Sequence, residues 1–382
     1  MNGYVIAHVI AHGMNAGGWR RRRVKTMGIT MKDIARLAGV SVNTVSRALN
    51  GKPEIDEKTR QRILEIAREH SYSPNSLAAS LASKKTRTVG LIVPDICDPF
   101  YAQQARGVED MARARGYTVI LINTDEDPKT ELKAVDTLRS KRVDGMLLTS
   151  VFPGIDHVVL LQKQHIPFVL LNRRLTSLDT DYVVNDNIKG AYEATRHLIR
   201  LGHTRIAHIT GPERITSVRE RLAGYTKAIQ EAGLSIQDDL VFTGESLKPQ
   251  SGEVLARRAL SVNPRPTAIF AFCDTLAMGA YATAKEMGLM VPEDLAIVGY
   301  DDIPFAACFE VPLTTVAQPS YEMGRTACKI LLDRIESGGN DQEQEGVPKG
   351  QVVFDARLVI RKSCGAYLGQ ERRRQNLAVI KG

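Results

Sequence analysis

A short segment near the N-terminus carries side chains that can read the edges of DNA base pairs. Asn43 and Arg47 lie four residues apart, and Val42 precedes them. An Asn amide can hydrogen-bond bidentately to adenine, an Arg guanidinium to guanine, and a Val side chain can contact the thymine methyl group. Ser41 and Thr44 can bind phosphate oxygens, together with the free N–H groups at the start of a helix. This pattern predicts a helix that enters the major groove, although on its own it also fits an ordinary helical hairpin with a polar outer face.

Two short helices are expected to position these side chains. Thr30 and Asp33 have the spacing of a capping box, which begins a first helix. Ser41 can cap a second helix, Val42 to Leu49, and Asn50 with the following glycine can end it because both tolerate left-handed backbone angles. The apolar residues of the two helices recur at helical spacing and should face inward; they are Ile34, Ala35, Ala38, Val45, Ala48 and Leu49. Val42, Asn43, Ser46 and Arg47 then point outward, and a third helix is expected from Asp56.

The charge of the chain is divided unevenly between this segment and the rest. Residues 1–87 carry 16 Lys and Arg against 6 Asp and Glu, whereas residues 88–360 carry 29 against 36. A basic module on an acidic body is typical of a nucleic-acid reader joined to another domain, although a solvated basic tail would give the same imbalance. The five cysteines are widely spaced and lack a CxxC pair, which favours reduced thiols in a cytoplasm. No apolar run reaches the length of a membrane helix, so no membrane partner is expected.

The chain after residue 88 alternates buried strands with amphipathic helices. The expected strands are Val89–Val93, Val119–Ile122, Gly145–Leu148, Phe168–Leu171, Ile206–Ile209, Ala268–Phe272 and Ala296–Gly299. Such alternation predicts an α/β fold with parallel sheets covered by helices on both faces, and its length is enough for two lobes. Ligands bind such folds at the carboxyl ends of the strands, where the loops converge.

The sequence lacks the motifs that would favour an enzyme or a metalloprotein. GxSxG, GxxxxGK[ST], GxGxxG and HExxH are all absent. Tyr281 and Lys285 match a YxxxK pattern, but no glycine-rich nucleotide turn accompanies them, so we interpret the match as accidental. His8 and His12 lie at i, i+4 without further ligands. No catalytic residue, metal site or cofactor is therefore predicted.

Several ordered motifs closely resemble the LacI (lac repressor) family of transcriptional regulators. They are MKDIARLAGVSVNTVSRALN at 31–50, YSPNSLA at 72–78, GLIVPD at 90–95, DPFY at 98–101, RVDG at 142–145, GHTRI at 202–206, RLAGY at 221–225, VGYDD at 298–302 and PLTTVAQP at 312–319. The resemblance covers roughly residues 30–362. It implies a helix-turn-helix headpiece joined to a regulatory domain like the periplasmic sugar-binding proteins, which has two lobes.

The resemblance also implies how DNA is bound. A homodimer would bind a near-palindromic double-stranded operator, with hinge helices in the minor groove and the Leu81 side chain wedged between base pairs. The implied DNA-binding residues are Thr30, Ser41, Val42, Asn43, Thr44, Ser46, Arg47, Asn50, Asn75, Ala78 and Leu81. The tail shows no leucine heptad, so a tetramer-forming coil is not expected. A repressor is the favoured interpretation, and an activator of the same family is the alternative.

The implied effector pocket lies between the lobes. By position its residues are Phe100, Tyr101, Asn172, Arg173, Ser217, Arg221, Cys273, Asp274, Asp301 and Gln318. Charged and amide groups suit vicinal hydroxyls, and the aromatic rings can stack on a sugar or a base, which favours a sugar-like effector. Cys273 departs from the family, where many relatives have Asn, so Asp274 becomes the expected polar group there. A pentose, a hexose or its phosphate, a nucleoside and a purine stay open, as does the choice between inducer and corepressor.

The expected domain order follows from these assignments. Residues 1–28 form an extension that is either disordered or a misread start before Met27 or Met31. Residues 29–72 form the DNA-binding domain, 73–87 the hinge helix and linker, 88–362 the effector-binding and dimerisation domain, and 363–382 a basic tail. Within the effector domain, the N-lobe is expected at 88–186 and 318–346, and the C-lobe at 187–317 and 347–362.

Overall fold

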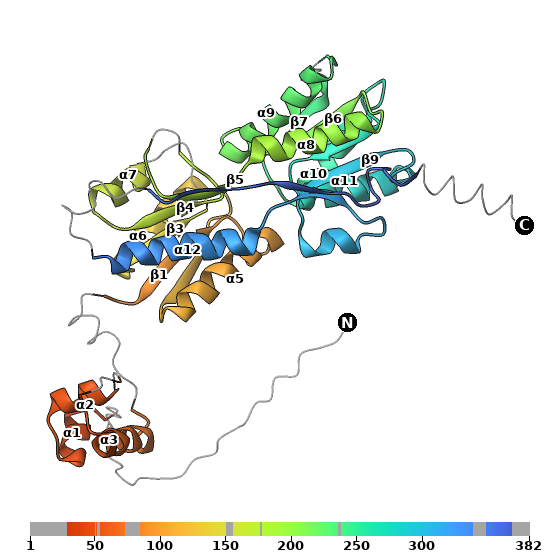
Figure 1. Cartoon of the computed structure of the whole chain (residues 1–382). Coiled ribbons are helices and arrows are strands. Elements are labelled where there is room, and N and C mark those ends of the chain that lie inside the picture. The colour runs from red at the N-terminus through yellow and green to blue at the C-terminus, as the bar shows by residue number, and fades with distance from the viewer. Residues whose placement is uncertain are drawn as a thin grey trace, which may run out of the picture. The chain divides into compact units, whose positions relative to one another are not determined.

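The computed structural model describes residues 29–49, 51, 54–72, 85–149, 156–175, 178–235, 238–338 and 349–368. The chain divides into two compact units, Met1–Ala79 and Ser80–Gly382. Figure 1 shows the smaller unit in red and the larger one in orange through blue. Each unit has its own hydrophobic core.

The described part of the first unit holds three helices: α1 (Met31–Ala38), α2 (Val42–Leu49) and α3 (Glu57–Glu69). The predicted capping box is present, because Thr30 Oγ1 accepts from Asp33 N at 3.3 Å and Asp33 Oδ2 accepts from Thr30 N at 3.0 Å. Gly39 ends α1 with a φ of 68°, a left-handed angle that glycine adopts without strain. Ile34, Val45 and Ile63, one from each helix, are fully buried against one another. These local signals explain why the helices begin and end where the sequence predicts.

The first lobe of the larger unit is built on a six-stranded sheet in the order β11-β5-β4-β3-β1-β2. Its strands are β1 (Thr88–Val93), β2 (Thr118–Asn123), β3 (Gly145–Leu148), β4 (Phe168–Leu171), β5 (Tyr182–Asn185) and β11 (Gln351–Phe354). Its helices are α5 (Pro99–Ala114), α6 (Pro128–Ser140), α7 (Asp156–Lys163) and α12 (Ser320–Glu336). All its strand pairs are parallel, which places the loops that follow the strands at one edge.

The second lobe repeats this plan with the order β12-β10-β9-β8-β6-β7. Its strands are β6 (Ile206–Thr210), β7 (Val241–Thr243), β8 (Ala268–Ala271), β9 (Ala296–Asp301), β10 (Thr314–Ala317) and β12 (Arg357–Val359). Its helices are α8 (Asn187–Arg200), α9 (Thr216–Glu231), α10 (Pro249–Leu260) and α11 (Asp274–Glu286), with two short 3₁₀ turns, η1 (Asp238–Leu240) and η2 (Pro304–Cys308). Figure 1 shows the dark-blue C-terminal segment passing from one lobe to the other.

The last crossover of the chain between the two lobes differs from the prediction. The sequence predicts residues 347–362 in the second lobe, but β11 pairs in parallel with β5 of the first lobe, from Gln351 opposite Tyr182 to Phe354 opposite Asn185. The chain therefore crosses after Phe354, and only β12 joins the second sheet, antiparallel to β10. The strands β5, β7, β10, β11 and β12 were not predicted. They are three or four residues long, so their pairing with neighbouring strands determines that they form strands more than any local sequence pattern does.

Candidate DNA-reading helix and ligand cleft

Helix α2 presents the predicted base-reading side chains to solvent. Its first turn is fixed by Ser41, whose Oγ accepts from Thr44 N at 3.1 Å and lies 2.9 Å from Thr44 Oγ1. Val45 and Ala48 are buried in the small core, so the opposite side of the helix faces outward. Val42 is 39% exposed, and Asn43 and Arg47 are exposed as well. Thr30 is exposed at the N-cap of α1, and Ser46 is half-buried.

Arg47 has an ion partner that the sequence did not reveal. Its Nη1 lies 3.2 Å from Glu54 Oε2, and the two side chains are 49% and 61% exposed. The contact joins the second helix to the segment before α3. A carboxylate at this position competes with any DNA group for the same guanidinium. The other predicted DNA contacts, Asn50, Asn75, Ala78 and Leu81, lie outside the described residues.

A cavity lies between the two lobes of the larger unit, at the carboxyl ends of both sheets. Eight of the ten predicted effector residues line it: Phe100, Tyr101, Asn172, Arg173, Ser217, Arg221, Cys273 and Asp301. Asp98, Leu247 and Phe272 also line it and were not predicted as effector contacts. Asp98 marks the start of α5 and Phe272 follows a buried strand, but Leu247 lies in a loop without a sequence signal. The free volume of this inner cavity is about 20 Å³, which is room for about one water molecule.

The inner cavity continues into a wider groove, which shares Asp98, Tyr101 and Leu247 with it. The groove has a volume of about 690 Å³ and is lined by loops and helix starts of both lobes. This size is within the range of small-molecule sites, so a ligand can enter from the groove. Full entry into the inner cavity requires the side chains or the lobes to move.

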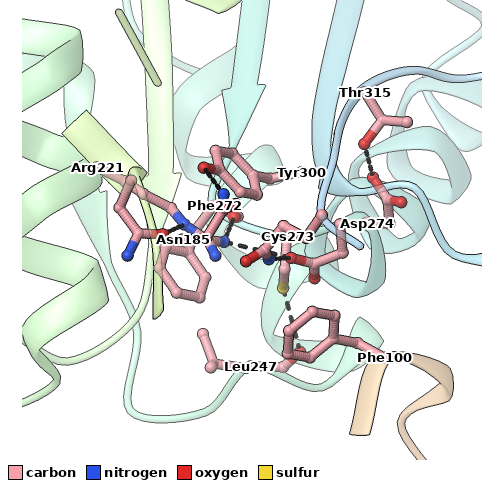
Figure 2. A network of polar contacts seen from close by, with 12 residues as sticks. Phe100, Asn185, Arg221, Leu247, Phe272, Cys273, Asp274, Tyr300 and Thr315 are labelled. Carbon is pink, nitrogen blue, oxygen red and sulfur yellow. Dashed lines mark hydrogen bonds and ion pairs between the residues drawn. The ribbon is translucent and has the colours of Figure 1, made fainter. Parts of the chain in front are cut away.

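Arg221 is the central cation of the inner cavity, and aromatic rings enclose it. Its guanidinium carbon lies 3.6 Å from the centroid of the Tyr300 ring and 4.3 Å from that of Phe272. Its Nε donates to Asn187 Oδ1 at 3.0 Å, and its Nη1 donates to the Phe272 carbonyl oxygen. Figure 2 shows the guanidinium beside these two rings. A buried cation held in this way keeps one fixed orientation.

Asp301 is the acidic partner of Arg221 and is strained. Its Oδ1 lies 3.5 Å from Arg221 Nη1 and accepts from Gln318 Nε2 at 2.6 Å. The backbone of Asp301 has a φ of 117°, which a residue with a side chain rarely adopts and which is typical of functional positions. Burial raises the pKa of the Asp301 carboxyl well above its usual range, and the nearby Arg221 only partly offsets this. Gln318 does not line the cavity itself; it orients Asp301 from behind.

Polar atoms on the first-lobe side of the cavity lack partners. Arg173 is 2% exposed, and only its Nη2 is paired, with Glu126 Oε1 at 2.8 Å. Its Nε and Nη1 have no hydrogen-bond partner, and neither does Asn172 Oδ1. Burial opposes the charge of Arg173, but Glu126, Tyr101 and Glu131 together outweigh burial, so the guanidinium pKa is raised. An unsatisfied buried donor or acceptor costs about 1 to 3 kcal/mol, so these atoms favour a ligand that can bond to them.

Asp274 is, after Gln318, the second residue of the predicted pocket that the structure corrects. Asp274 is fully buried and does not line the cavity. Its Oδ1 accepts from Thr315 Oγ1 at 2.6 Å and its Oδ2 from Ile303 N at 2.9 Å, as Figure 2 shows for Thr315. Burial raises its pKa to about 7. Asp274 thus joins α11 to β10 and to the segment after β9, because the carboxylate turns inward, while Cys273 lines the cavity.

Cys273 gives the cavity an apolar patch. Its Sγ lies 2.9 Å from Thr275 Oγ1, and burial strongly raises the pKa of the thiol, so it stays neutral. Phe100 and Leu247 lie close to it in Figure 2. Among the residues that the structure describes, no group of His, Cys, Asp or Glu side chains could hold a metal ion, and no helix is long and apolar enough to span a membrane.

A helix-turn-helix unit joined to a two-lobed α/β unit with a ligand cleft defines a ligand-responsive DNA-binding regulator. Comparisons with known proteins agree. Residues 30–75 match the family described as bacterial regulatory proteins, lacI family. Residues 86–355 match periplasmic binding proteins and the sugar binding domain of the LacI family. The chain belongs to the LacI family of transcriptional regulators.

The similarity to individual relatives extends over nearly the whole length of each relative. The HTH-type transcriptional regulator DegA of Bacillus subtilis is 38% identical over 88% of this chain and 98% of its own. The HTH-type transcriptional repressor CytR of Escherichia coli is 36% identical over 88% and 96%. The lac repressor dimer bound to operator and an anti-inducer is 27% identical, with a TM-score of 0.77 over 88% of this chain and 99% of that one. A CelR–cellobiose complex is 33% identical, with a TM-score of 0.67 over 88% and 99%.

Proposed function

We propose that this chain is a transcriptional repressor whose operator affinity is controlled by a neutral, sugar-like ligand bound in the inner cavity. The observation that carries the ligand proposal is the set of buried polar atoms without partners, Asn172 Oδ1 and Arg173 Nε and Nη1. Asn172 and Arg173 both line the cavity, so these buried atoms supply one acceptor and two donors beside it. A hydroxyl group both donates and accepts, so vicinal hydroxyls can satisfy all three atoms.

The charges of the cavity favour a neutral ligand over a phosphate. Both cations that line it already face a carboxylate, Arg173 with Glu126 at 2.8 Å and Arg221 with Asp301 at 3.5 Å. Asp98 adds a further acidic group. A phosphate would bring two negative charges to a site that already holds the acidic groups of Glu126 and Asp98, and desolvating them is costly. The rings of Phe100 and Phe272 can cover the apolar face of a sugar.

The relatives support this chemistry. One solved relative is named as a cellobiose complex, and another LacI family regulator, from Enterococcus faecium, has bound ribose and is 31% identical. CytR and the PurR of Aliivibrio salmonicida are named as repressors, which favours repression over activation for this chain. A regulator of this kind acts on DNA in the bacterial cytoplasm and needs no catalytic group or cofactor.

We also propose a homodimer on a near-palindromic operator. Residues 29–72 would enter the major groove through α2, and residues 73–87, with Asn75, Ala78 and Leu81, would contact the minor groove. Exposed apolar side chains of both lobes suit a second copy of the chain: Leu121 and Leu132 in the first lobe and Val254 in the second. The lac repressor, bound to its operator as a dimer, supports this assembly. Residues 1–28 and 363–382 have no part in the proposal.

The test is a thermal-shift screen of the purified protein against pentoses, hexoses, disaccharides, nucleosides, purines and sugar phosphates. A ligand at one hundred times its Kd adds about 2.7 kcal/mol to the free energy of unfolding, which gives a clear rise in Tm. A neutral sugar is expected to raise Tm, and the corresponding sugar phosphate is not. Fluorescence anisotropy with operator DNA, with and without the sugar, then separates an inducer from a corepressor.

Two variants make the screen specific to the cavity. Asn172→Gly removes the unpartnered oxygen, and glycine tolerates the φ of 67° at this position, so the fold should persist. It is expected to weaken sugar binding at least tenfold. Arg257→Gln removes the exposed ion pair of Arg257 with Glu286 on α10 and α11 and should bind like the wild type. The proposed ligand chemistry would be overturned if a nucleoside bound and no sugar did. It would also be overturned if Asn172→Gly left the affinity for the sugar unchanged.

A further inference from the structure

An ion pair outside the cavity connects the two lobes. Arg174 follows β4 in the first lobe, and Glu220 belongs to α9 of the second lobe. The Nε and Nη2 of Arg174 both donate to Glu220 Oε1, at 3.3 and 3.2 Å. The side chain of Glu220 is 16% exposed and that of Arg174 is 37% exposed. The pair is thus partly shielded from water and screened less by salt than a fully exposed pair.

The same glutamate also reaches the central arginine of the cavity. Its second oxygen, Oε2, accepts from Asn187 Nδ2 at 2.8 Å. Asn187 in turn uses its Oδ1 to accept from Arg221 Nε at 3.0 Å. Asn187 is 3% exposed and is the first residue of α8, directly after the chain crosses between the lobes. The order Arg174, Glu220, Asn187, Arg221 is therefore a continuous chain of hydrogen bonds from one lobe into the ligand cleft of the other.

We propose that Glu220 is a positioning residue of the effector site, which holds Arg221 through Asn187 and ties it to the first lobe through Arg174. The inference rests on the proposed function, because it assigns Glu220 a role toward the ligand that Arg221 contacts. Each carboxylate oxygen has a separate task. Oε1 accepts from Arg174 only when the lobes are close together on this side, and Oε2 holds the Asn187 amide so that its oxygen points at Arg221.

This arrangement couples the ligand to lobe closure. Among the described residues, Asn187 Oδ1 is the side-chain oxygen that orients Arg221 Nε. Loss of this bond leaves Nε unpaired and weakens the hold on a guanidinium that the Phe272 carbonyl and Asp301 still contact. A ligand favours the lobe arrangement in which Arg221 is correctly oriented, and it can shift the balance only by that difference in affinity. Partly exposed ion pairs contribute modestly, so a loss of the Arg174–Glu220 pair should weaken ligand binding about threefold to fivefold.

The first measurement needs no ligand. Hydrogen exchange followed by mass spectrometry is compared for the full-length wild type, Arg174→Gln, Arg174→Lys and the control Arg257→Gln. Arg174→Gln is expected to speed exchange in the first turns of α8 and α9, which belong to the other lobe. Arg174→Lys keeps the charge and should preserve most of the protection, and Arg257→Gln should leave these turns unchanged. Faster exchange confined to the segment around residue 174 would overturn the connection between the lobes.

The second measurement tests the positioning role. The sugar that raises Tm in the screen above is titrated into Glu220→Gln, whose amide can accept at only one of the two positions. Its Kd is expected to rise about threefold to fivefold with an unchanged Tm of the free protein. The exchanged pair Arg174→Glu with Glu220→Arg should not recover this loss, because a guanidinium at position 220 cannot accept from Asn187 Nδ2. An unchanged Kd would refute the positioning role. If no sugar binds the wild type, the proposed function fails, while the exchange result still decides whether the lobes are connected here.

Discussion

Replacing Glu54 by glutamine is expected to strengthen operator binding. Arg47 lies on the outer side of α2, and its Nη1 is 3.2 Å from Glu54 Oε2. For Arg47 to contact DNA fully, this pair must break or rearrange. The carboxylate also repels the phosphates, although salt screens that effect beyond about 10 Å. The Glu54→Gln variant keeps the size and polarity of the side chain and removes the charge.

The size of the effect follows from the exposure of the two side chains. They are 49% and 61% exposed, so the pair belongs with surface ion pairs that contribute about 0.2 to 1 kcal/mol. At about 0.59 kcal/mol for RT, removing that competition tightens binding about 1.4- to 5-fold for each recognition helix. A dimer with two such helices would show about the square of that factor. Because the pair is weak, the Tm of the variant should stay close to that of the wild type.

The assay is fluorescence anisotropy with an operator selected from random DNA, at several salt concentrations. Glu65→Gln is the matched control, since Glu65 is exposed on α3 and its substitution removes the same charge from the same unit. Glu54→Gln should bind more tightly than both the wild type and this control. Equal gains for the two variants would mean that only net charge matters. No gain for Glu54→Gln would refute the idea that Glu54 competes for Arg47.

Three further predictions concern recognition, packing and pH. Asn43→Ala should lose about 1 to 3 kcal/mol of discrimination at one base pair, seen as relaxed sequence preference in a binding-site selection; an unchanged preference would exclude Asn43 from base reading. Gly107→Ala should lower the free energy of unfolding by about 1 to 3 kcal/mol in a urea titration, because the new Cβ would lie 2.1 Å from the Tyr321 carbonyl oxygen of α12. An unchanged free energy of unfolding would show that α5 and α12 move apart to fit the methyl group without cost. Burial raises the pKa of Asp98 to about 6, so the folded state holds this proton more tightly and the free energy of unfolding falls as pH rises from about 4 to 6. Asp98→Asn keeps a cap for the Phe100 N–H and has no proton to lose in this range. The free energy of unfolding of the variant, minus that of the wild type, should therefore be up to about 3 kcal/mol larger at pH 7 than at pH 4. A difference that does not change with pH in chemical denaturation would contradict this.

The DNA-binding unit could be predicted closely because its signals are local. The Thr30–Asp33 capping box and the Ser41 cap join residues three positions apart, and their hydrogen bonds form within the same helix turn. The lobes were predicted from runs of buried strand residues. Most cavity residues followed from the family resemblance, which fixes which strand ends meet; composition and periodicity alone would not have selected them.

The remaining features depend on contacts between distant parts of the chain. Asp274 turns away from the cavity because Thr315, far along the sequence, offers its carboxylate a hydrogen bond in the core. The last crossover lies after Phe354 because β11 finds its partner in β5, a choice that no local pattern records. The contact of Glu220 with Arg174 likewise exists only when both lobes are folded and close together, and its contact with Asn187 only when α8 packs against α9. The sequence by itself determined the helix caps, the alternation of strands and helices and the family; the tertiary structure decided which polar group faces the ligand and which is used in the core, because a buried carboxylate or amide goes where its hydrogen bonds can be satisfied.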